Sequence, residues 1–213
     1  MAILVQNTEN PENSAVISYR KILEMAYPLI LSTTSYTIMR FIDRMFLSWN
    51  SQEDIEAVVP ASMLSFMFIA FFIGTASYAN ALLGQYFGAG KPESFAKVFF
   101  QGWYFSLFST IIILMLIPVG HYLILKSGHN QMVIKRELIY FNWSMYTGGV
   151  IVFNNFLSAF FSSQSKTFLV MIVNFIGCAI SVFLDYHLIF GHFIFPQLGI
   201  LGAGIAAFIS MIS

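Results

Sequence analysis

The sequence predicts an all-α polytopic membrane protein in which six transmembrane helices form one bundle. Of the 213 residues, 58% are hydrophobic and only 9% are charged, with a mean hydropathy of +0.75, whereas soluble domains carry about 25% charged residues. The chain also divides into runs of about 20 or more mostly apolar residues, the length that a helix needs to cross a bilayer. These runs lack the alternation of apolar and polar residues that transmembrane strands require.

Each predicted helix is bounded by a segment that favours a break. The first break is acidic, the second combines Gly, Lys and Pro, the third is polar, the fourth is a serine-rich turn and the fifth carries Gly and Pro. The breaks are NSQEDIE (50–56), GQYFGAGKPE (84–93), KSGHNQMVIKRE (126–137), SSQSKT (162–167) and GHFIFPQLG (191–199). We therefore place helices over residues 22–49, 58–83, 94–125, 138–163, 168–190 and from 199 onward.

The two ends of the chain differ in character. Residues 1–19 are polar and lack the basic-then-apolar order of a cleaved signal peptide, so we expect a short solvated tail. Residues 20–213 then form the six-span bundle. The last apolar run, from 199 to 213, stops without a flanking charge, and we expect a truncated sixth span in a fragment of a longer protein.

The distribution of Lys and Arg predicts the orientation, because cytoplasmic loops carry an excess of both. The basic residues on the side of the N-terminal tail are Arg20, Lys21, Lys91, Lys97 and Lys166; those on the other side are Lys126, Lys135 and Arg136. The sequence thus predicts a multi-pass protein of the plasma or inner membrane with a cytoplasmic N-terminus.

Two carboxylates are placed at matching depths within the predicted spans. Asp43 precedes the end of the first helix near Trp49 by six residues, and Asp185 precedes the end of the fifth helix near Gly191 by six. Both helices run in the same direction, and at 1.5 Å per residue both acids lie about 9 Å below the same surface. Ionisable groups at membrane depth usually face a bundle interior or an aqueous cavity, so we expect one shared site.

Polar residues share a helix face with each acid, by the 100° helical period. The candidate pocket-lining residues are Tyr36, Arg40, Asn154, Asn155, Asn174 and Ser181. Structural alternatives remain open for some residues: Gly177 and Cys178 suit close helix packing, and Arg44 suits snorkelling to the interface. Arg40 is spaced to pair with Asp43 within one helix. His187 and His192 stay unassigned.

Composition narrows the function classes. The ten basic and ten acidic residues give no indication of a nucleic-acid partner, and the single cysteine forms neither a disulfide framework nor a metal-ligand set. No hydrolase or nucleotide-binding motif is present, so we expect neither an enzyme nor a cofactor. Burial disfavours the charged form of a carboxylate, so Asp43 and Asp185 suit exchange of H⁺, or binding of Na⁺ where other oxygens surround them.

Three segments together resemble the multidrug and toxic compound extrusion (MATE) family of transporters. They are AYPLILSTTSYTIMRFIDRMFLS (26–48), GQYFGAGKPE (84–93), and NFIGCAISVFLDYHLIFG (174–191) followed by PQLGILGAGIAA (196–207). The resemblance implies a twelve-helix transporter of which this chain is the N-terminal six-helix half, with the driving cation at Asp43 and Asp185. Ser181 departs from the family's common asparagine and leaves the choice between H⁺ and Na⁺ open.

The resulting hypothesis is a cation-coupled antiporter, driven by H⁺ or Na⁺, that exports organic, often cationic, compounds. Its expected partners are a small organic substrate, the lipid bilayer and the missing C-terminal half. Two alternatives remain. A flippase for lipid-linked precursors predicts a wider, more basic cavity with Arg40 facing it. A non-transporting membrane subunit predicts that replacing the acids impairs assembly rather than flux.

Overall fold

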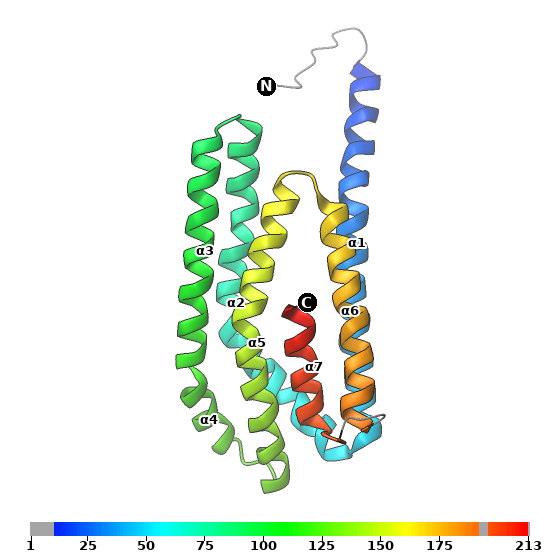
Figure 1. The fold of residues 1–213 in the computed structure, drawn as a ribbon, viewed down its shortest axis with the longest axis vertical. Helices are drawn as coiled ribbons and strands as arrows, with labels where there is room; N and C mark the ends of the chain where they lie inside the picture. The colour runs from blue at the N-terminus through cyan, green and yellow to red at the C-terminus, as the bar shows by residue number, and fades with distance from the viewer. Residues whose placement is uncertain (1–10, 192–195, 213) are drawn as a thin grey trace.

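The computed structural model describes residues 11–191 and 196–212, and seven helices account for almost all of them. Their bounds are α1 (Pro11–Asn50), α2 (Gln52–Gly88), α3 (Pro92–Met115), α4 (Ile117–Leu125), α5 (Gln131–Ser163), α6 (Thr167–Phe190) and α7 (Ile200–Ile212). The helices form a single elongated bundle (Figure 1). Taken together, α3 and α4 make the third span, so the predicted all-α, six-span class is confirmed.

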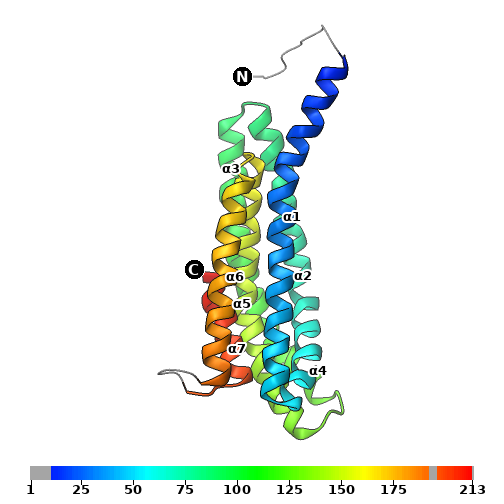
Figure 2. The ribbon, with the colours of Figure 1, turned by 90° about the vertical axis from the view of Figure 1, so that its right-hand side faces the viewer.

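The helices alternate in direction along the bundle (Figures 1 and 2). Helices α1, α3 and α6 run away from the end that holds the N-terminus, and α2, α5 and α7 run back towards it. Helix α5 is central and packs against α2, α3, α4, α6 and α7. Helices α1 and α6 lie side by side and run in the same direction, which brings the predicted site residues of both helices to one wall.

Three helices of the described chain are long and apolar enough to cross a membrane by composition alone: α2, the α3–α4 segment and α6. Helix α1 also has the required length but carries Arg40, Asp43 and Arg44, and polar side chains interrupt α5 along its length. Helix α7 is shorter, with 13 residues. The spans that hold the polar side chains are therefore the ones with the weakest hydropathy signal.

Two predicted boundaries are corrected. Helix α1 begins at Pro11, so helical backbone extends into the segment predicted as a tail; proline favours the first position of a helix because its fixed φ suits it. The first ten residues of that tail lie outside the described part of the chain. Helix α2 begins at Gln52, within the predicted acidic break, because the Ser51 side chain caps the Asp54 N–H at 3.1 Å.

The predicted third helix (94–125) is also corrected, because it breaks at Leu116 into α3 and α4. Pro118 lies two residues beyond the break. Proline has no N–H to donate to the carbonyl four residues earlier, and its ring collides with that carbonyl. The helix therefore changes course, and α4 runs at an angle to α3 (Figure 1).

A continuous aromatic contact joins α3 to α5. The ring pairs are Phe95–Phe160, Phe99–Phe156, Phe99–Phe160 and Trp103–Phe153, with centroids 4.7–5.6 Å apart. Gly102 allows the two helices to approach, because a Cβ there would collide with the ring of Phe156. The tightly packed side of the bundle is therefore the side formed by α2, α3 and α5.

We expect Gly102→Ala to lower the stability of the bundle. Phe156 is 1% exposed and its ring packs against Phe99, and overpacking of this kind costs about 1–3 kcal/mol. Thermal unfolding in detergent micelles measures the effect. Gly84→Ala is the matched control, since a Cβ there meets nothing within 4 Å and alanine is the better helix former. Equal melting temperatures for the two variants would contradict close packing of α3 against α5 at Gly102.

Candidate functional site

Asp43 of α1 and Asp185 of α6 line the same small cavity. Its volume is about 30 Å³, and α5 and α7 close it from the other side. The lining residues are Met39, Arg40, Asp43, Tyr140, Thr147, Ile151, Ser181, Asp185, Ala207 and Met211. A cavity needs roughly 10–15 Å³ to hold one water molecule, so this one accommodates a water or an ion of similar size.

Each carboxylate has one oxygen without a hydrogen-bond donor. The Ser181 hydroxyl donates to Asp185 Oδ2 at 3.4 Å, and Tyr140 lies with Asp43 in the wall of the same cavity. Within the described residues, no donor reaches Asp43 Oδ1 or Asp185 Oδ1, although both atoms are shielded from solvent. Asp185 is only 2% exposed. Buried acceptors are normally satisfied, so the cavity presents two oxygens that lack a positive or hydrogen-bonding partner.

Arg40 interacts with Tyr36 rather than with Asp43. Its Nη2 and Nε donate to the Tyr36 hydroxyl at 2.6 and 3.1 Å, and no ion pair with Asp43 is formed in the described structure. Side chains of a helix point towards its N-terminus, so the long arginine reaches the residue four positions earlier. Arg44 is exposed on the surface of α1. The two acids are therefore not neutralised by a direct ion pair.

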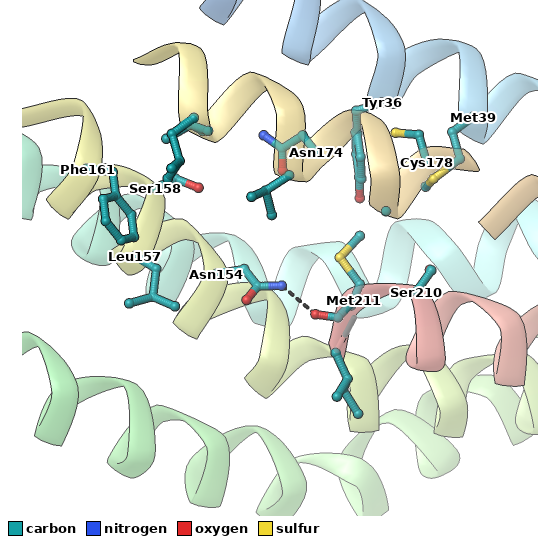
Figure 3. A pocket seen from close by; sticks show the side chains of 15 residues that line it. Tyr36, Met39, Asn154, Leu157, Ser158, Phe161, Asn174, Cys178, Ser210 and Met211 are labelled. Carbon is teal, nitrogen blue, oxygen red and sulfur yellow. Dashed lines mark hydrogen bonds between the residues drawn. The ribbon is translucent and has the colours of Figure 1, made fainter. Parts of the chain in front are cut away.

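A larger cavity of about 270 Å³ lies beside the first, among α1, α5, α6 and α7 (Figure 3). The candidates Tyr36, Asn154 and Asn174 line it, as do Gly177 and Cys178. Asn154 Nδ2 donates to the Met211 carbonyl at 2.6 Å.

Asn174 Nδ2 donates to Ser32 Oγ of α1 at 2.6 Å. Asn155 lines neither cavity, and its amide donates to the Ile151 carbonyl of its own helix at 3.0 Å. His192 lies outside the described residues, and His187 Nδ1 contacts the Phe183 carbonyl.

Two polar residues of the small cavity were not predicted from the sequence. Tyr140 and Thr147 lie two turns apart on the same side of α5. Their seven-residue spacing was visible in the sequence. However, α5 carries polar residues on several faces, so the spacing alone did not indicate which face meets α1 and α6.

A buried polar cluster closes the bundle at the end distant from the N-terminus, where α1 and α6 also end. Arg136 of α5 forms an ion pair with Asp54 of α2, which is 0% exposed, and also donates to Ser51 Oγ at 2.9 Å. Asn50 donates to Asp54, and Gln197 Nε2 donates to Asn50 Oδ1 at 3.1 Å. This end cluster (Asn50, Ser51, Asp54, Arg136, Gln197) ties α1, α2, α5 and the α6–α7 connection together.

The comparisons with known proteins agree with this architecture. Curated relatives include the multidrug resistance protein MdtK of Edwardsiella ictaluri, 28% identical over 188 residues, and MdtK of Klebsiella pneumoniae subsp. pneumoniae, 26% identical over 192. The aligned regions cover 88% and 89% of this chain. The chain spans only 41% and 42% of the length of these relatives.

Solved structures show the same fold. An outward-facing multidrug resistance MATE family transporter of the MOP superfamily superposes with a TM-score of 0.80 at 19% identity, over 90% of this chain and 42% of that one. An inward-facing conformation gives a TM-score of 0.74 at 18% identity, over 90% and 43%. The family model described as MatE matches residues 28–187, which is most of the chain. The chain therefore belongs to the MatE family, as its sequence motifs indicated.

Proposed function

We propose that this chain supplies the cation-coupling half of a secondary-active antiporter, which exports organic, often cationic, compounds in exchange for H⁺ or Na⁺. The observation that carries the proposal is the small cavity, where Asp43 and Asp185 converge and each leaves a buried oxygen without a partner. The relatives named multidrug resistance proteins support the exporter class. The coupling ion and the exchange are inferred from the site.

The chemistry follows from two acids in one small space. Like charges that share a buried site repel each other, and a bound cation relieves the repulsion. Binding H⁺ or Na⁺ between α1 and α6 would therefore favour the arrangement in which both acids face one cavity. A cation shifts a conformational equilibrium only by its difference in affinity for the two states, and a site that brings the two acids together in one state alone would supply that difference.

The sizes of the two cavities suggest separate tasks. The 30 Å³ cavity suits an ion or a water, and the 270 Å³ cavity suits part of an organic molecule, since drug-sized ligands occupy about 300–1,000 Å³. The two cavities share Met39 and Met211 in their walls. Cation binding in one would therefore alter the shape of the other. We expect the second six-helix half to complete the substrate site.

The flippase alternative is less well supported by the geometry. It predicts a wide and basic cavity, whereas Arg40 is the single basic residue that lines either of the two described cavities. Arg40 does line the small cavity, and it is held there by Tyr36. Arg40 therefore belongs to the wall of the cation site. The basic residues continue to favour a cytoplasmic N-terminus and a cell-membrane location.

The test is efflux of a lipophilic cationic dye from liposomes that contain this chain joined to a second six-helix half, which the proposal requires for a complete substrate site. We expect an inward-directed gradient of H⁺ or of Na⁺ to accelerate efflux, because the cation enters at Asp43 and Asp185 as the dye leaves. A K⁺ gradient of the same size and membrane potential is the control. Equal efflux under H⁺, Na⁺ and K⁺ gradients would rule out the coupling.

A further inference from the structure

A second buried acid lies outside the cation site, at the junction of α4 and α5. Glu137 is on the second turn of α5, just before the segment predicted to span the membrane, and is 1% exposed. Its Oε1 contacts His129 Nδ1 at 2.7 Å. His129 belongs to the connection of residues 126–130 that joins α4 to α5, and its side chain is 42% exposed. The contact thus joins a solvent-accessible imidazole to a buried carboxyl.

Within the described part of the chain, no other group compensates the charge of Glu137, because its buried Oε2 meets no hydrogen-bond donor. The flanking residues of α5 (Val133, Ile134, Tyr140 and Phe141) are all buried. Burial raises the pKa of Glu137, and the hydrogen bond with His129 partly offsets this effect. The pair is therefore most stable when it holds one proton in common, either on the imidazole or on the carboxyl.

The neighbouring charged groups have partners elsewhere. Arg136 interacts with Asp54 and Glu53 of α2, and Lys126 lies over the ring of Tyr122 at 4.6 Å. On the facing elements, His121 Nε2 of α4 contacts Asn142 Oδ1 at 2.6 Å, and Glu56 of α2 accepts from Gln52. Lys135 is exposed on α5. Among the described residues, His129 is the titratable group that meets Glu137.

We propose that His129 and Glu137 form a proton-dependent latch, which holds the α4–α5 connection against α5 and releases it as the pH rises. While the shared proton is bound, the pair is neutral overall or forms a compensated ion pair. When the proton is lost, a buried carboxylate faces a neutral imidazole, and an uncompensated buried charge is strongly unfavourable. The carboxylate then gains solvation only if the connection moves away.

The rest of the connection is built to allow this movement. Gly128 adopts a positive φ of 76°, a conformation that glycine adopts without strain. The Asn130 side chain caps Met132 N at 3.2 Å, so α5 keeps its own N-terminal cap when His129 leaves. The latch ties the mobility of this end of the bundle to the pH of the compartment that it faces, and it is independent of the proposed cation site.

The experiment measures the mobility of a nitroxide at position 125, where the native leucine is 62% exposed at the end of α4. The labelled protein carries Leu125→Cys and Cys178→Ala in lipid nanodiscs, and spectra are recorded from about pH 5 to about pH 9, which covers the usual titration of carboxyl and imidazole groups. We expect the immobile component to be lost as the pH rises. In His129→Ala it is absent at every pH.

Glu137→Gln separates the latch from a general effect of pH. Glutamine keeps the size of the side chain but has no proton to lose, so the immobile component persists across the whole range. Glu56→Gln, an exposed acid at the same end, keeps the pH response of the parent. Should Glu137→Gln not fold, His129→Ala carries the test, because it removes the contact with Glu137 and the immobile component with it. A parent spectrum that does not change with pH, a full pH response in Glu137→Gln, or an immobile component retained in His129→Ala overturns the proposal.

Discussion

Asp185→Asn is expected to reduce ion-driven dye efflux to the level of protein-free liposomes. The amide has nearly the same shape as the carboxylate, so it still accepts from Ser181 and fills the same space, but it neither releases a proton nor attracts a cation. Because the substitution removes a buried charge next to Asp43, we expect the melting temperature to stay the same or to rise. Gradient-driven efflux and thermal unfolding of the same preparation check both results.

Glu56→Gln is the matched control for Asp185→Asn. It makes the same change from acid to amide on an exposed residue at the same end of the bundle, and we expect wild-type efflux. Undiminished efflux in Asp185→Asn would remove Asp185 from the coupling mechanism. A loss of folded protein in place of a loss of flux would instead support the non-transporting subunit.

Arg136→Ala is expected to destabilise the bundle more than the substitution of any exposed residue at the same end. Asp54 is fully buried and is paired with Arg136. Removing one partner of a buried ion pair lowers the free energy of unfolding by about 3–5 kcal/mol, because the other charge stays buried without compensation. The exposed neighbour Lys135 provides the control, because Lys135→Ala leaves no buried charge behind. Thermal unfolding in nanodiscs measures the difference.

The double variant Asp54→Asn with Arg136→Ala identifies the cause. If the damage comes from the uncompensated carboxylate, the asparagine removes it and restores much of the lost stability. Asn50 remains able to hydrogen-bond at position 54. A double variant no more stable than Arg136→Ala would show that the arginine acts through its other contacts, with Ser51 and Glu53.

The spans and the depth of the two acids were predictable from the sequence for a simple physical reason. Hydropathy locates a membrane helix because a segment that crosses lipid must be mostly apolar and must satisfy its backbone hydrogen bonds internally, as a helix does. The fixed rise per residue of the helix then converts sequence position into depth. Asp43 and Asp185 therefore meet at one level in the structure, on α1 and α6. The break between α3 and α4 was not predicted, although Pro118 in the segment IPVG is a signal for it.

Contacts between helices were not predictable in the same way. Tyr140 and Thr147 join the site because of how α5 rotates against α1 and α6, and one sequence holds no measure of that rotation. The ion pair between Asp54 and Arg136 joins positions 82 residues apart, both of them within predicted polar breaks. The partner of Arg40 depends on the side-chain direction in α1, which favours Tyr36 over Asp43.

The uneven packing of the bundle gives it two sides of different stiffness. Helices α2, α3 and α5 interlock through aromatic rings and close glycine contacts, whereas α1, α6 and α7 meet α5 around two cavities. Atoms that border a cavity have fewer partners and lose less dispersion energy when they move. We therefore expect α1, α6 and α7 to shift more easily than α2, α3 and α5 during a conformational change. Two of these more mobile helices, α1 and α6, carry Asp43 and Asp185.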